Sequence, residues 1–87
     1  MISTVQDLAA EALFASDVQP SEHPGRQRLE DAVTTMILRH GSDGCAAVVA
    51  AEFGDHPEAA VRRMCWAREE VRRVTVAQRR PQTTAGR

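Results

Sequence analysis

The stretch HPEAAVRRMCWAREEVRRVTVAQR, residues 56–79, holds the longest helical pattern in the chain. On a helical wheel at about 100° per residue, its apolar side chains gather in one narrow stripe. The stripe consists of Ala60, Met64, Ala67, Val71 and Val74, with alternating spacings of four and three residues. At about 1.5 Å per residue this helix would be about 35 Å long. The stripe must therefore face several other elements or a partner.

Three further helices are expected before this one, and no stretch alternates as a strand would. Apolar residues at steps of three and four predict helices over residues 4–16, 26–40 and 43–53. Pro20 and Pro24 mark a linker after the first helix, because the residue before a proline is pushed out of helical geometry. Gly41 suits a left-handed cap after the second helix. Gly54 ends the third helix and opens the turn before the fourth.

The third predicted helix should be the central one. Residues 45–51 carry no charge, and a helix that is apolar all round is normally buried. Its alanines would let neighbouring helices approach closely. The sequence thus predicts an all-α fold: one four-helix domain over residues 1–80 with a long C-terminal helix, followed by a disordered tail over residues 81–87.

Composition and charge exclude some classes of function. The 87 residues carry a formal net charge of −1 and only 3% aromatic side chains, which argues against a strongly basic surface and against a stacking platform for single-stranded nucleic acid. Residues 1–55 hold three arginines and nine acidic residues, whereas residues 56–87 hold eight arginines and three glutamates. Such a split lets the chain pair with itself, within one molecule or between two, although two merely solvated faces would also account for it. Within the last helix, Glu58–Arg62 and Glu69–Arg73 have the spacing of weak stabilising pairs.

The number of cysteines and the N-terminal residues indicate the cellular compartment. Two cysteines do not make a disulfide framework. The chain starts without a basic segment followed by a long apolar run, which disfavours a signal peptide, and no stretch is apolar enough to span a membrane. The expected location is the cytoplasm, with both thiols reduced.

Candidate catalytic and metal-binding residues are few. The side chains able to ligate a metal are His23, His40, Cys45, Asp55, His56 and Cys65. None of them forms a pair with zinc-site spacing, so no metal or other cofactor is expected. Cys45 follows the start of the third predicted helix, which could lower its pKa, and His40 lies five residues earlier as a potential base. Nothing supplies an oxyanion site or a substrate cleft, so a non-enzymatic protein is expected.

Nucleic-acid binding is one alternative. Residues 49–54, the following turn and residues 58–64 resemble a helix-turn-helix. The arginines that would track a DNA backbone are Arg62, Arg63, Arg68, Arg72 and Arg73. Against this, Asp55 and Glu58 stand at the start of the would-be recognition helix, where they would repel phosphates.

Protein association is the favoured alternative. The other predicted helices, at about 16–24 Å, are too short to cover the stripe as far as Val71 and Val74. An uncovered apolar turn usually marks a partner surface. Trp66 lies among arginines on the charged side, which is typical of an interface hot spot, although the same residue would be plain core if the first helix packed there. We therefore expect a homodimer or an unknown protein partner. The predicted interface is Met64, Trp66, Ala67, Val71 and Val74.

The sequence also resembles a group of short actinobacterial helical proteins of uncharacterised function. The resemblance is carried by residues 12–16, 19–21 and 23–24, then by residues 44–47, 50, 52–58, 64 and 66–67, and it covers roughly residues 3–70. It implies a cytosolic, helical, actinobacterial protein. It assigns no catalytic or binding residue.

Overall fold

A computed structural model describes residues 4–79 of the chain. In this range the elements are α1 (Thr4–Ala15), the short 3-10 helix η1 (Pro20–Glu22), α2 (Arg26–Asp55) and α3 (Pro57–Arg79). The fold is all-α, as predicted, and no strand occurs within the described residues. The predicted tail over residues 81–87 lies outside this range.

The prediction of four helices is wrong in number, because the second and third predicted helices are joined as α2. Gly41 has φ 73° and ψ 172°, a conformation that only glycine adopts readily, and it bends α2 sharply. Helical geometry resumes immediately, so no loop separates the arm over residues 26–40 from the arm over residues 42–55. Gly44 lies inside the bend, where an added Cβ atom would stand 2.8 Å from the Cβ atom of His40.

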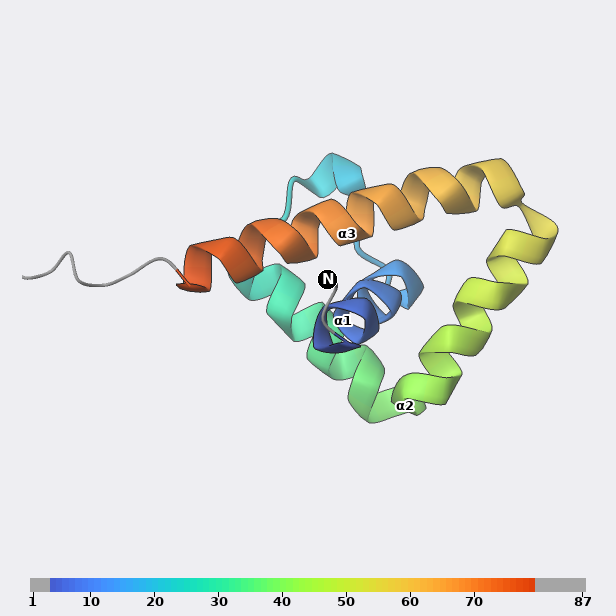
Figure 1. Cartoon of the computed structure of the whole chain (residues 1–87), viewed down its shortest axis with the longest axis horizontal. Coiled ribbons are helices and arrows are strands. Elements are labelled where there is room, and N and C mark those ends of the chain that lie inside the picture. Colours follow the sequence, from blue (N-terminus) through green and yellow to red (C-terminus); the bar gives the residue numbers. More distant parts are fainter. Residues whose placement is uncertain (1–3, 80–87) are drawn as a thin grey trace, which may run out of the picture.

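The two arms of α2 and the long α3 form the three sides of a triangle, and α1 passes through its middle (Figure 1). The prediction of a central, fully apolar third helix is therefore wrong: the central element is α1. In the second arm of α2 only Cys45 is buried and Val49 is half-buried, while Ala46, Ala47 and Val48 are exposed. Only one face of that arm meets the rest of the molecule, so the alanines on its other faces remain in water.

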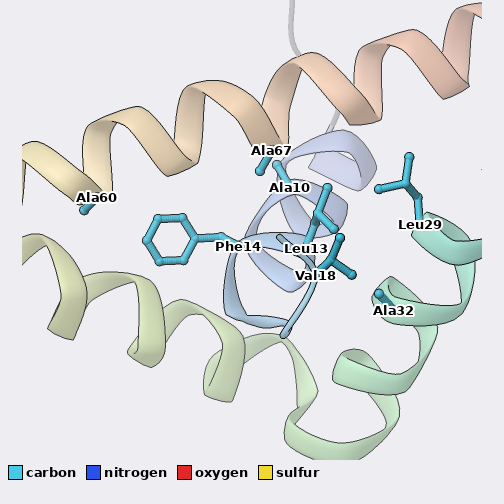
Figure 2. Close-up of a cluster of buried hydrophobic side chains, with 8 residues drawn as sticks. All are labelled: Ala10, Leu13, Phe14, Val18, Leu29, Ala32, Ala60 and Ala67. Carbon is cyan, nitrogen blue, oxygen red and sulfur yellow. The ribbon is translucent and has the colours of Figure 1, made fainter. Parts of the chain in front are cut away.

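The core is small and rich in alanine. It is made by Ala10, Leu13 and Phe14 of α1, Val18 of the linker, Leu29 and Ala32 of α2, and Ala60 and Ala67 of α3. Figure 2 shows Leu13 and Val18 directed toward Leu29 and Ala32, whereas Phe14 extends the other way, toward Ala60. Phe14 also stacks on Phe53, with ring centroids 6.1 Å apart. Alanines at the contacts allow the helices to approach closely.

The linker between α1 and α2 is held by its own polar contacts. The backbone N–H of Gln19 donates to the Glu22 carboxylate over 2.8 Å, which closes a capping box at η1. Arg28 of α2 pairs with Glu22 at 3.2 Å and with Asp17 at 3.3 Å. The backbone hydrogen bond from Gln19 and the ion pair with Arg28 lower the pKa of Glu22. These contacts fix the path of the linker from α1 to α2.

Candidate functional site

The apolar stripe of α3 faces the protein's own core. Ala60 and Ala67 are 2% and 0% exposed, and Met64, Val71 and Val74 are half-buried against the same core. Ala67 of the predicted interface is therefore unavailable to a partner in this structure. The other four members of that set, Trp66 included, contribute one side of their surface to the single subunit.

Part of the stripe remains open at one end. A groove of about 240 Å³ separates α1, the first arm of α2 and the second half of α3. Its apolar lining residues are Val5, Ala9, Leu13, Leu29, Val33, Val71 and Val74. Val5, in the first turn of α1, is 75% exposed. The expectation that the other helices leave Val71 and Val74 incompletely covered agrees with this geometry.

The sequence left open whether Trp66 belongs to the core or to an exposed interface, and in the structure it has features of both. Its side chain is half-buried and packs against the core. The guanidinium carbon of Arg63 lies 5.0 Å from the centroid of the indole ring, which is the geometry of a cation–π contact. Trp66 thus forms one side of the core, and the guanidinium group of Arg63 lies over its indole ring.

Arg63 has the largest set of polar contacts among the described residues. Its guanidinium donates to the backbone carbonyls of Phe14 at 2.8 Å, Ser16 at 2.9 Å and Val18 at 2.9 Å, with a longer contact to Leu13 at 3.4 Å. Burial lowers the pKa of Arg63 from its ordinary value. The side chain serves as an external cap on the C-terminus of α1, and its donors are not available to a phosphate.

The sequence gives an indirect signal for this role that wheel analysis missed. The last turn of α1 contains no basic residue to interact with its carbonyl groups. The Ser16 hydroxyl donates to the Leu13 carbonyl over 2.6 Å and accepts the Val18 N–H over 3.2 Å. The remaining carbonyls need a donor from elsewhere, and Arg63 provides it.

The four other arginines that the sequence proposed as DNA contacts fall into two groups. Arg72 and Arg73 pair with Glu69 and Glu70, three residues earlier in each case, so the expected Glu69–Arg73 pair does not form. Arg73 also reaches the Pro24 carbonyl at 3.4 Å.

The remaining two, Arg62 and Arg68, have no hydrogen bond or ion pair with another residue in the range 4–79. The same is true of Glu58 within that range, so the expected Glu58–Arg62 pair is also absent.

A second face of α3, roughly 120° around the helix from the stripe, carries apolar side chains as well. Val61 is 50% exposed, and Cys65, one turn later, is exposed and has a free thiol. On the same face Glu58, Arg68 and Arg72 are also exposed. Because helical residues three and four apart are neighbours, these side chains form one continuous strip along α3. At its C-terminal end Arg68 and Arg72 border a hollow that Gln6 and Asp7 of α1 also line.

Cys45 is not a poised nucleophile. It is fully buried, and its thiol donates to the Met36 carbonyl at 3.7 Å. Burial, with a smaller contribution from Glu11, raises the pKa of Cys45, so the expectation of a lowered value is wrong. A new helical arm does begin after the non-helical Gly41, but the Cys45 thiol near its start is buried, and burial is the largest cause of its raised pKa.

Two further observations concern ligands and membranes. Among residues 4–79, His, Cys, Asp and Glu side chains do not gather in any group of three or more suited to a metal ion. In the same part of the chain, every helix falls short of the length and apolar character that a membrane crossing requires.

Comparisons with models of protein families, with curated proteins and with solved structures found no match to this chain.

Proposed function

We propose that the protein is a small non-enzymatic interaction or regulatory module that self-associates through α3. The observation that supports this is the exposed outer face of α3, where Val61 and Cys65 stand in water although the stripe on the inner face already fills the core. Exposed apolar residues at the spacing of neighbouring turns are typical of helix-pairing surfaces. Localisation in the cytoplasm and kinship with short actinobacterial proteins belong to the same proposal.

DNA binding through a helix-turn-helix is less well supported. A single residue, His56, joins α2 to α3, whereas the turn of such a motif usually has three or four residues. Arg63 is used within the subunit, and Arg72 and Arg73 each have a glutamate partner. Of the five arginines proposed as DNA contacts, Arg62 and Arg68 are the two that remain free to contact phosphates.

Sedimentation velocity over a wide range of protein concentration tests the proposal. We expect the mass to rise from 9.5 kDa toward twice that value as concentration increases. Val61→Glu should shift the equilibrium to monomer, because it places a charge in the contact. Ala59→Glu is the matched control: it introduces the same charge at an exposed position two residues away, on another face of α3.

A concentration-independent monomer would overturn the proposal. In a parallel titration with random duplex DNA near physiological salt, we expect little change in fluorescence anisotropy. Tight, salt-sensitive binding that is lost in Arg62→Ala or Arg68→Ala would favour DNA binding instead.

A further inference from the structure

Five exposed residues recur along the outer face of α3 at spacings of three, four, three and four. They are Glu58, Val61, Cys65, Arg68 and Arg72, and we refer to them as the outer ridge. This spacing is that of the alternating contact positions in a two-helix coiled coil. The stripe that faces the core has the same kind of spacing, so α3 has two seams with this spacing, roughly 120° apart around the helix.

The order of residues along the outer ridge is self-complementary. Val61 and Cys65 form its apolar centre, an acidic residue lies three positions before this centre, and a basic residue lies three positions after it. Glu58 and Arg68 are the two charges concerned, and neither has a partner within residues 4–79. In an antiparallel copy of the helix the acidic and basic positions are exchanged and the centre stays apolar. The acid of one copy therefore faces the base of the other.

From this arrangement, and resting on the proposed self-association, we propose that the occupant of the outer ridge is the α3 helix of a second copy, paired antiparallel about a two-fold axis. Val61 packs against Cys65 of the partner subunit, and Glu58 pairs with Arg68 of the partner subunit. The symmetry repeats each contact, so one interface contains two apolar contacts and two ion pairs.

Other registers of the same two helices do not have this match. Sliding the partner by seven residues in one direction places Val61 against Arg72 of the partner subunit and Cys65 against Arg68 of the partner subunit. Sliding it the other way places Glu58 against Val61 of the partner subunit. A parallel, in-register pair would oppose each charge with its own copy, which is unfavourable. Only the proposed register pairs apolar with apolar and acid with base.

The second half of α3 then runs past the junction of α2 and α3 in the other subunit. In the proposed register Arg72 extends past Pro57, where α3 of the other subunit begins, toward the junction that carries the acidic Asp55 of the partner subunit. The acidic beginning of each helix thus meets the basic end of the other. The contact involves one helix from each copy, so we expect a weak, concentration-dependent dimer rather than an obligate one.

Substitution of Arg62 should strengthen the dimer, whereas the other substitutions weaken it. It lies beside the outer ridge, close to the two-fold axis, so the two copies of Arg62 come near each other. Removing this charge with Arg62→Gln should tighten the dimer roughly twofold to threefold, because two like charges no longer approach. If the ridge bound DNA, the same substitution would weaken binding.

Directed cross-linking tests the register. In Val61→Cys the new thiol and the native Cys65 of the partner subunit should be opposite each other, and diamide should link them in a covalent dimer. Peptide mapping should locate the link between positions 61 and 65. Ala59→Cys, at an exposed position away from the ridge, is the control and should give no such link. Cys45 is buried and should not take part.

Charge exchange tests the ion pairs independently. Arg68→Glu should weaken the dimer roughly tenfold, because two attractions become two repulsions. Glu58→Arg combined with Arg68→Glu should restore most of the affinity. Thermal unfolding of each variant, measured at a concentration where it is monomeric, separates this effect from the favourable position of Glu58 in the first turn of α3.

The outcomes distinguish this inference from the proposal on which it rests. A monomer at all concentrations would overturn both. A dimer that cross-links no better than the Ala59→Cys control, or whose links join position 61 to position 61, would overturn the antiparallel ridge and leave self-association standing. A dimer that is lost instead in Thr34→Arg, at the edge of the apolar groove, would place the contact in that groove and overturn the ridge.

Discussion

Replacing Arg63 by methionine should destabilise the domain strongly, although the residue lies on the charged side of α3. Methionine keeps the aliphatic volume of the side chain and removes the guanidinium group. Three hydrogen bonds of 2.8–2.9 Å to the backbone carbonyls of Phe14, Ser16 and Val18 are lost, together with the contact to the ring of Trp66.

The expected loss can be worked out from these contacts. Hydrogen bonds to a charged group contribute about 1.5–3 kcal/mol each, and we take about 1 kcal/mol for each of the three because water can partly replace the donor at a half-buried site. The cation–π contact at 5.0 Å adds roughly 0.5 kcal/mol. The sum, about 3–4 kcal/mol, is a large share of the roughly 4–13 kcal/mol typical of a chain of 87 residues.

Thermal unfolding followed by circular dichroism at the helix band measures this loss. At about 4–8 °C per kcal/mol for a domain of this size, the midpoint should fall by about 15 °C or more. Arg62→Met is the matched control: it makes the same change one residue earlier, at an exposed side chain, and should change the free energy of unfolding by less than about 0.5 kcal/mol. Equal midpoints for the two variants would refute a capping role for Arg63.

The remaining predictions concern two glycines and the two thiols. Gly41→Ala should lower the free energy of unfolding by about 1–3 kcal/mol, because the backbone there has a positive φ of 73°. Gly54→Ala should raise it by about 0.5 kcal/mol, because an added Cβ atom meets nothing within 4 Å. Urea titrations of both variants measure the two opposite changes. Burial raises the pKa of Cys45 and shields its thiol, so iodoacetamide should modify only the exposed Cys65 in the native protein. Mass spectrometry counts the modified thiols, and equal labelling of both would contradict the burial of Cys45.

Much of the fold was predictable because helical periodicity is a local property. The spacing of apolar residues identified the face of α3 that meets the core, and Ala60 and Ala67 are buried on that face. The positive φ expected at Gly41 is also present. Whether the helix stops or resumes after such a glycine depends on how the two arms pack against α1 and α3, and contacts between elements are not contained in a local pattern.

The burial of individual segments was harder to predict. The uncharged run from Cys45 to Ala51 looked like a core helix, yet most of it lies in water. Alanine has so little apolar surface that leaving it exposed is inexpensive, so a run of alanines indicates only weakly which side is buried. The longer side chains of α1, Leu13 and Phe14, have more apolar area to remove from water, and α1 is the central element.

The arginines of α3 show why counting charges did not locate the site. Arg62 and Arg63 are adjacent in sequence, but about 100° of rotation directs one into solvent and the other onto the carbonyl groups at the end of α1. Two further arginines are neutralised by glutamates three residues away. The basic excess of the C-terminal half therefore does not act as one surface. On the outer ridge the unpaired Glu58 and Arg68 flank Val61 and Cys65, and this order gives the ridge a direction along the helix, which net charge alone does not. For this reason we propose a second copy of the helix, turned end over end, and not a uniformly charged polymer, as the partner of this face.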